Sequence, residues 1–494
     1  MNSLRKIDQF LAKIEPPKWL MAVLAAVVVL RIPSFFEPYN YGDEMIYLAL
    51  GNAIRRGITI YQSIHDNKPP LLYLTAALAG NLFWFKAILT LWMIVTIIAF
   101  WKLTKMLFNG NKRAEIIATI AFSILTTIPL FEGNIVNAEL FLIGPIIIAF
   151  TILLGNPSLK KTFLAGILFS IATLFKFPAV FDIGAIVLFW LISIRSGKKI
   201  TEIISQSFAL LLGLVIPIAL TAVYFWTKGA LSDYISIAFL QNLGYVSSWS
   251  GGSGGSFIAK HLTILIRGVI VLIGAIILFL FQKKLSKTFI FTCLWLLTSL
   301  FAVTLSERPY PHYLIQAIPS ISILIGMLLG GKTIEQLLVI FPLALSVFVP
   351  VYYKFYYYPT FSYYAKFVSF ATGKTSKTDF FNTFNSQTDN NYKISSFIMT
   401  STANDAKVFV WGNDAPVIYA LSRRLPPIKY VADYHISDFS STAKVAEELT
   451  QKPPTLVVIL PDSPEYPELT KLIDKKYVLV STIGRAEIWH LLKS

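Results

Sequence analysis

Apolar segments long enough to cross a membrane recur through the first 353 residues, and short polar loops separate them. A membrane-spanning helix needs about 20 apolar residues. Suitable segments lie at 19–36, 86–107, 114–131, 137–155, 205–226, 258–281, 288–305, 311–329 and 334–353. The stretch 162–195 is too long for one helix and is interrupted at Pro178, so we expect two helices there. The pattern predicts a polytopic α-helical membrane protein with about eleven spans.

The segment 71–85 decides the topology, because it is apolar but short and follows Pro69-Pro70. If it crossed the membrane, most lysine-rich loops would face outward. If it stayed at the surface, those loops would join the basic amino terminus on the inside, where positively charged loops are usually found. We therefore predict a juxtamembrane or re-entrant helix at 71–85. The protein is then a multi-pass protein of the plasma membrane with a cytoplasmic amino terminus.

A pattern of alternating strands and helices begins near residue 407. Strands are expected at 407–411, 428–432, 456–460, 477–482 and 486–490, and helices at 416–424, 442–451 and 465–475. Continuous apolar strands between amphipathic helices predict a small, parallel-rich sheet covered on both faces. No Gly-x-Gly-x-x-Gly sequence follows the first strand, so we predict no nucleotide there.

These patterns divide the chain into a transmembrane domain at 1–358 and an extracytoplasmic α/β domain at 359–494. Within the first domain we expect an outer loop with juxtamembrane helices at 37–85. A second outer loop at 227–257 is rich in glycine and serine, which predicts flexibility. This second loop is either a lid that orders over a bound substrate or a slack connector.

Composition and charge narrow the possible partners. The chain has 494 residues, 55% hydrophobic and 14% charged, with a mean hydropathy of +0.63. Its net charge of +16 would suit nucleic acid. However, residues 360–494 carry a net charge of only +2, and the remaining +14 lies mostly in short loops that set membrane topology. We therefore predict a membrane environment and no nucleic-acid partner.

Polar residues that are costly near hydrocarbon gather on one side of the membrane in this topology. They are Asp43, Glu44, Asp66, Lys68, Glu132, Asn134, Asn137, Glu139, Lys176, Arg308 and His312. All of them fall on the outer side, although the topology was chosen from the loop cations alone. The sequence therefore predicts a single site on the outer face.

Asp43 and Glu44 are the candidate catalytic residues. Adjacent residues on a helix point about 100° apart, so one carboxylate can face a reacting acceptor while the other holds water, a metal or a base. The alternative is a structural role, in which Asp43 caps the helix that follows.

Four cations are candidates for binding a phosphate, namely Lys68, Lys176, Arg308 and His312. Two prolines follow Lys68 and fix a non-helical approach to the helix at 71–85, a setting that suits phosphate at the level of the lipid headgroups. Lys68 could instead pair with Asp66. A structural role for His312 also stays open.

A second carboxylate could position the acceptor or bind a metal. Asp66, Asn137 and Glu139 are the candidates for the acceptor side. A divalent metal is an open alternative to metal-free chemistry, with Glu44 and Glu139 as its candidate ligands. Asn137 and Glu139 could also do no more than cap a helix.

The order of these residues resembles that of the GT-C membrane glycosyltransferases, especially the protein O-mannosyltransferase (family 39) and aminoarabinose-transferase-like branch. The matching pieces are Gly42-Asp43-Glu44, Asp66-Asn67-Lys68-Pro69-Pro70-Leu71-Leu72-Tyr73, Asn137-Ala138-Glu139, Lys176 and the segment 308–313. The resemblance covers roughly residues 20–330, and the acidic pair together with the Lys-Pro-Pro segment is its most specific part. Residues 359–494 are similar, more loosely, to the outer domain of some bacterial members.

The resemblance implies a polyprenyl-phosphate sugar as donor, a catalytic carboxylate in the first outer loop, and inverting transfer of a hexose or pentose on the outer face. Asp43 falls where the family has its catalytic acid, and Lys68 falls where the family contacts the lipid phosphate. The acceptor would be a hydroxyl of a protein, a lipid or a glycan. The main alternative is a transporter or flippase for lipid-linked glycans, and a catalytically inactive binding protein is a further one.

Overall fold

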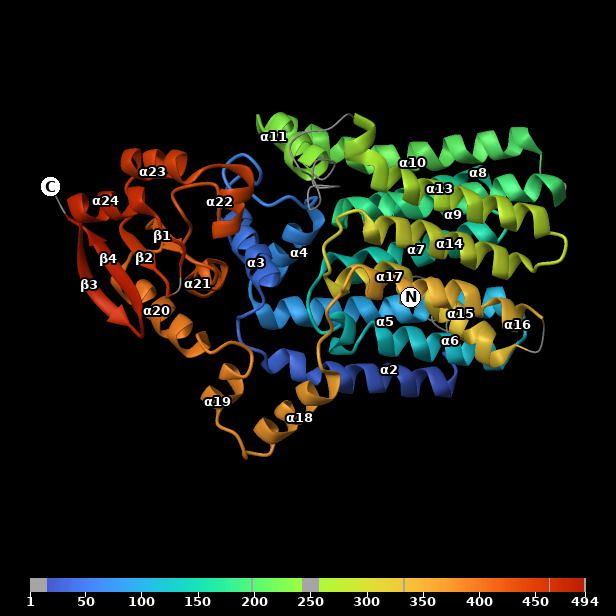
Figure 1. The fold of residues 1–494 in the computed structure, drawn as a ribbon, viewed down its shortest axis with the longest axis horizontal. Helices are drawn as coiled ribbons and strands as arrows, with labels where there is room; N and C mark the ends of the chain where they lie inside the picture. The colour runs from blue at the N-terminus through green and yellow to red at the C-terminus, as the bar shows by residue number, and fades with distance from the viewer. Residues whose placement is uncertain (1–15, 197–198, 242–256, 332–333, 462, 493–494) are drawn as a thin grey trace, which may run out of the picture.

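The computed structural model describes residues 16–196, 199–241, 257–331, 334–461 and 463–492. They form a long bundle of helices and, at one end of it, a smaller tail that contains a β-sheet (Figure 1). The segment 37–85, which is the predicted first outer loop and keeps that name below, lies between the two parts. We call the end of the bundle next to the tail its tail end.

Each of the eleven predicted spans corresponds to a helix of the bundle. They are α2 (Lys18–Arg31), α5 (Leu82–Phe108), α6 (Lys112–Leu125), α7 (Ala138–Leu154), α8 (Leu159–Phe175), α9 (Ile183–Ile192), α10 (Ile200–Thr227), α13 (Phe257–Phe281), α14 (Lys287–Thr304), α15 (Ile318–Gly330) and α17 (Ile340–Tyr352). Short α16 (Glu335–Leu338) precedes α17. In the described part of the chain, seven helical segments are long and apolar enough to cross a membrane. A membrane-embedded helical protein is thus supported, while eleven spans stay a prediction.

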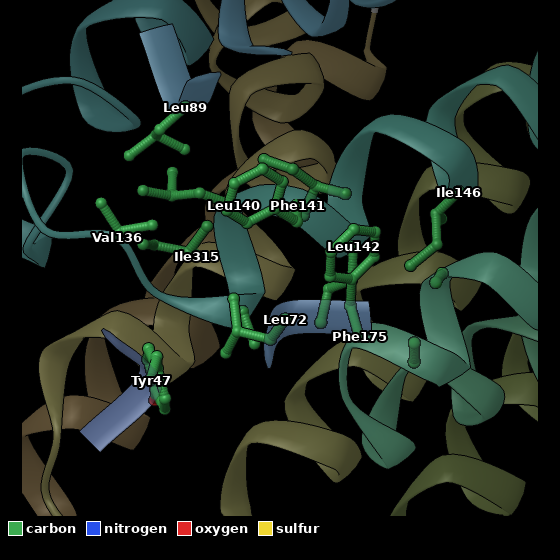
Figure 2. Packing of buried hydrophobic residues seen from close by; sticks show 14 of the residues in the cluster. Tyr47, Leu72, Leu89, Val136, Leu140, Phe141, Leu142, Ile146, Phe175 and Ile315 are labelled. Carbon is green, nitrogen blue, oxygen red and sulfur yellow. The ribbon is translucent and has the colours of Figure 1, made fainter. Parts of the chain in front are cut away.

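The α7 helix forms the centre of the bundle because it is apolar on every side. Its Leu140, Phe141 and Ile146 pack among side chains of α5, α8 and the segment around Ile315 (Figure 2). The rings of Phe141 and Phe175 stack with centroids 5.0 Å apart. By contrast, α10 and α13 expose many Leu, Ile and Phe side chains, as expected for helices that face lipid.

The first outer loop contains α3 (Gly42–Arg55) and α4 (Leu71–Ala79). At 1.5 Å per residue, the nine residues of α4 are too short to cross about 30 Å of hydrocarbon. The predicted helix at 71–85 is wrong at its carboxyl end. Gly80 has φ +70° and ends α4, and the Asn81 side chain accepts a hydrogen bond from Trp84 N–H and starts α5.

The described residues of the tail form seven helices and four strands in the order α18 (Thr360–Ala371), α19 (Lys377–Asn382), α20 (Thr388–Ser401), β1 (Val408–Trp411), α21 (Ala415–Ser422), α22 (Asp433–Phe439), α23 (Thr442–Gln451), β2 (Leu456–Ile459), α24 (Pro467–Lys476), β3 (Tyr477–Ile483) and β4 (Ala486–Leu491). The strand order is β1-β2-β4-β3. Helices α20 and α21 cover one face of the sheet, and α23 and α24 pack on the other.

Two predictions for the tail are wrong. The sheet is mixed, because only β1 and β2 are parallel, whereas β4 is antiparallel to both of its neighbours. Gly484 at φ +60° makes a tight turn between β3 and β4, and such a turn joins antiparallel strands. The segment 428–432 is not a strand of the sheet. Tyr430 instead forms an isolated bridge with His65 of the first outer loop.

The tail lies against the first outer loop through polar contacts. The side chains of Asn52 and Arg56 donate hydrogen bonds to the Arg423 carbonyl oxygen, at 3.1 and 2.6 Å. The backbone N–H of His65 donates to the Lys429 carbonyl oxygen at 2.8 Å. These contacts hold α22 over the tail end of the bundle, beside α3 (Figure 1).

The predicted flexible loop at 227–257 is partly helical. It contains α11 (Leu231–Ile235), followed by a π-helical turn at Ser236–Leu240. Its Gly/Ser-rich part and the alternative of a lid lie outside the described residues.

Candidate functional site

A cavity of about 820 Å³ lies at the tail end of the bundle. It collects side chains from α3, α7, α14, the 3-10 turns η3 (Phe177–Asp182) and η6 (Pro311–Ala317), and α22 of the tail. Seven predicted site residues line it: Asp43, Asp66, Lys68, Glu139, Lys176, Arg308 and His312. The predicted convergence of these distant residues is therefore present in the fold. Glu44 and Asn137 are not part of the lining.

Asp43 stands in the first turn of α3, and its side chain is 28% exposed to the cavity. Tyr41 is the N-cap residue of this helix, so Asp43 is not the cap. Tyr47 OH donates a hydrogen bond to Asp43 Oδ2 at 2.8 Å, and Lys68 Nζ lies 3.5 Å from the same oxygen. Burial would raise the pKa of Asp43, but the charges of Lys68 and His312 and the Tyr47 hydrogen bond lower it to about 2. Asp43 is therefore an ionised carboxylate at neutral pH.

Two hydrogen bonds hold the backbone of Lys68 in the lining of the cavity. Its backbone N–H donates to Tyr73 OH at 2.9 Å, and Tyr61 OH donates to its carbonyl oxygen at 2.8 Å. Its Nζ lies 3.8 Å from Asp66 Oδ2 in addition to its contact with Asp43. Lys68 therefore pairs with Asp66 and lines the cavity at the same time.

Glu44 points away from the cavity, as the 100° spacing along α3 requires. Its Oε1 lies 2.9 Å from Lys86 Nζ and accepts a hydrogen bond from Val136 N–H at 2.7 Å. Lys86 Nζ also contacts Glu37 Oε2 at 2.7 Å and the Asn134 carbonyl oxygen at 3.0 Å. This buried network ties α3 to α5 and to the segment before α7.

Lys86 and Glu37 support the site, although the sequence pattern does not predict this role. Lys86 stands at the start of an apolar segment, where a lysine usually reaches toward the headgroups. The available signal is its place as the fifth residue of the helix that Asn81 starts, since a lysine so close to hydrocarbon needs a carboxylate partner.

Glu132 fixes His312 in the cavity wall. Its Oε2 pairs with His312 Nδ1 and accepts hydrogen bonds from Tyr41 OH at 3.0 Å and Asn137 Nδ2 at 3.2 Å. The structure therefore places Asn137 behind the cavity, where it orients Glu132. Asn137 is the N-cap residue of α7, but its side chain makes no capping hydrogen bond.

Two further ion pairs complete the polar wall. Lys176 pairs with Glu139, and its Nζ lies 3.9 Å from the centre of the Tyr313 ring. Arg308 Nη2 lies 3.9 Å from Asp438 Oδ2 of α22. Apolar side chains also line the cavity, namely Phe177, Phe181, Ile264, Phe301, Val303 and Leu305. The cavity thus joins a wall of paired charges to an apolar surface.

The tail supplies cavity residues that the sequence analysis did not find. They are Tyr434, His435, Asp438 and Phe439, all on α22. His435 Nε2 lies 3.8 Å from Asp66 Oδ1. The seven residues of α22 are too few for a periodic signal, and only the docking of the tail brings them to the cavity.

The candidate metal ligands do not meet. In the described ranges, no group of three or more His, Cys, Asp or Glu side chains could hold a metal ion. Glu44 and Glu139 belong to separate ion pairs with Lys86 and Lys176. We therefore derive no step that uses a metal.

Known structures share this architecture. ArnT, an aminoarabinose transferase, from Cupriavidus metallidurans bound to undecaprenyl phosphate superposes with a TM-score of 0.59 over 96% of this chain and 98% of ArnT. The same enzyme in the apo state gives 0.57 over 95% and 97%. Sequence identity is 13% in both cases.

This chain has the GT-C fold. The resemblance drawn from the sequence is thereby confirmed at the level of the fold. The Archaeoglobus fulgidus oligosaccharyltransferase is a weaker match, with a TM-score of 0.44 and 11% identity over 90% of this chain and 69% of that protein. No protein-family model and no curated protein matches the sequence.

Proposed function

We propose that this GT-C protein transfers a sugar from a polyprenyl-phosphate donor to an acceptor hydroxyl on the outer face of the plasma membrane. The observation that carries the proposal is the pairing, in one cavity, of an ionised carboxylate with a group of cations. Asp43 faces the space that Lys68, Lys176 and Arg308 also line. The structural neighbour ArnT, which binds undecaprenyl phosphate, supports a donor of this class.

Asp43 acts as the general base in this proposal. It takes the proton of the acceptor hydroxyl while the oxygen attacks the anomeric carbon and the bond from that carbon to the phosphate oxygen breaks. The electron pair of the broken bond leaves with the polyprenyl phosphate. A single displacement from the side opposite the phosphate inverts the anomeric centre, as in inverting hydrolases.

The cations stabilise the charge that develops on the leaving phosphate. Lys68, Lys176 and Arg308 are the candidate contacts, and Glu132 orients His312 beside them. Phosphate binding at Lys68 would also weaken the field that lowers the pKa of Asp43. The donor would thus make its own base more basic before transfer.

The apolar surface of the cavity gives the polyprenyl chain a place to lie. Ile264 belongs to α13, which exposes many apolar side chains and would meet lipid, and Phe181 of η3 and Phe301 of α14 line the same cavity. In the proposed orientation the amino terminus is cytoplasmic and the tail is extracytoplasmic. The site charges gather at one end of the bundle, which favours transfer at one membrane face over transport through the middle.

Donor turnover in liposomes distinguishes sugar transfer from transport of the intact donor. The purified protein is incubated with polyprenyl phosphate that carries a radiolabelled hexose or pentose, and with membranes of the source cells as acceptors. We expect labelled acceptor and free polyprenyl phosphate to appear together, with the opposite anomeric configuration in the product. Movement of intact donor across the bilayer, without cleavage of the sugar–phosphate bond, would contradict the proposal and indicate a transporter.

A further inference from the structure

A second cavity of about 260 Å³ lies where the first outer loop, α11 with its π-helical turn, and the tail meet. These three parts lie together beside α22 in Figure 1. His65 belongs to the first outer loop. Asp233 belongs to α11, and Ser236 belongs to the π-helical turn. Lys429 and Tyr430 belong to the tail. The cavity is therefore complete only when the tail is docked.

Two buried polar atoms at this cavity have no hydrogen-bond partner within the described parts of the chain. They are His65 Nε2, on a side chain that is 2% exposed, and Gln241 Oε1. A buried polar atom without a partner costs about 1–3 kcal/mol. A ligand with its own donors and acceptors would remove this cost once the side chains around these atoms shift to admit it.

The remaining groups match a polyhydroxylated ligand. Lys429 Nζ lies 3.4 Å from Asp233 Oδ1, so a donor and an acceptor stand side by side at the cavity. The half-buried rings of Tyr430 and Phe439 add apolar surface next to them. Sugars combine hydroxyl groups with apolar C–H faces, and they bind where hydrogen-bonding side chains adjoin aromatic rings. The π-helical turn that carries Ser236 is also a rare conformation that often occurs at functional sites.

This second cavity adjoins the catalytic cavity. Phe439 lines both of them, and His65 precedes Asp66, whose side chain faces the catalytic cavity. Resting on the proposed function, we propose that the second cavity binds one sugar unit of a saccharide acceptor. The neighbouring, terminal unit of the same acceptor would then present its hydroxyl to Asp43. The acceptor class is thus an oligosaccharide or polysaccharide, and the tail supplies part of its binding site.

Two substitutions test the cavity, and one serves as a control. Ser236→Trp fills it, and Lys429→Met removes one donor with little change in bulk. Ser396→Trp adds the same ring to an exposed position of α20 and is the matched control. Thermal unfolding of each variant reports whether it is folded. Labelled donor is supplied with separated polysaccharide, protein and lipid fractions of the source cells, and hydrolysis of the donor by water is measured in parallel.

We expect label in the polysaccharide fraction. Both cavity variants should lower this transfer at least tenfold at low acceptor concentration, while donor hydrolysis and the control stay within about twofold of the wild type. Label that enters only protein or only lipid would overturn the inference, as would unchanged transfer in both variants.

Binding without donor separates this inference from the proposed function. Saturation-transfer NMR is recorded with oligosaccharides cut from the same polysaccharide fraction. Signals with the wild type that are lost in both cavity variants would support the cavity even if no donor were consumed, a result that would count against the proposed function alone. Equal signals from all proteins would overturn the cavity.

Discussion

Two adjacent carboxylates on α3 have opposite environments because a helix turns their side chains apart. Asp43 meets the cavity and is ionised, while Glu44 is buried against Lys86. Asp43 is therefore accessible to a substrate in the cavity, and Glu44 anchors α3 through its ion pair with Lys86. Without the ion pair between Glu44 and Lys86, α3 would be held less firmly and the position of Asp43 in the cavity would be less well defined.

Lys68 is the cation closest to the proposed base, so its removal should affect transfer strongly. We expect Lys68→Gln to lower transfer by about 100-fold, the effect of losing one preorganised contact to developing charge. Lys68→Arg should keep part of the activity, because it keeps the charge. Steady-state rates at several donor concentrations check this, with the exposed Lys393→Gln as the control. Equal rates for Lys68→Gln and the wild type would remove Lys68 from phosphate binding.

His65 should make the protein less stable in acid. Burial and the nearby His435 lower the pKa of His65 from 6.5 to about 4. Between these values the unfolded chain binds a proton that the folded chain does not bind, so stability present above pH 6.5 is lost as the pH falls toward 4. The loss is on the order of 3 kcal/mol.

The unfolding midpoint measured from pH 7 to pH 4.5 tests this expectation. The non-titrating variant His65→Asn should show a flatter dependence on pH than the wild type. Parallel curves for the two proteins would show that His65 does not titrate differently in the folded and unfolded chains.

At the scale of elements, close packing of α8 and α10 depends on two glycines that face each other. A Cβ atom on Gly166 would lie 2.2 Å from the Leu210 carbonyl oxygen, and one on Gly213 would lie 2.1 Å from that of Phe163. Small residues allow membrane helices to approach in this way. We expect Gly166→Ala to lower stability by about 1–3 kcal/mol through overpacking.

Thermal unfolding in detergent measures this change. Gly268→Ala on α13 is the matched control, because a Cβ atom there meets nothing within 4 Å. A Gly166→Ala variant as stable as this control would show that the two helices can separate at little cost.

The Lys86 network links elements that are distant in sequence, so its loss should loosen α3. Lys86→Met leaves Glu37 and Glu44 buried without their cation, a change that typically costs about 3–5 kcal/mol. Lys86→Met combined with Glu44→Gln should recover part of the stability, because one buried charge is removed. Lys102→Met at an exposed position of α5 is the control. Unfolding midpoints that do not separate Lys86→Met from this control would contradict the role of the network.

At the scale of the whole molecule, hydropathy is sufficient to find the bundle helices, because each lies in an apolar run, from the 28 residues of α10 to the ten of α9. The carboxylates and lysines of the cavity were also predictable, since Asp43, Lys68 and Lys176 are costly near hydrocarbon wherever the chain folds. The order of strands was not predictable, because the pairing of β2 with β4 joins residues far apart in sequence. The contribution of α22 depends on the docking of the tail and leaves no local signal.

The central claim is that Asp43 performs the chemistry, and one comparison tests it most directly. Transfer from radiolabelled polyprenyl-phosphate sugars to endogenous acceptors is measured in vesicles that contain the wild type, Asp43→Asn, or Asp389→Asn at a half-buried position of α20, far from the cavity lining, as the control. Loss of a general base typically lowers the rate by about 10²–10⁴-fold. We expect a loss of this size in Asp43→Asn only, with donor binding retained. Equal transfer by Asp43→Asn and the wild type would contradict the account.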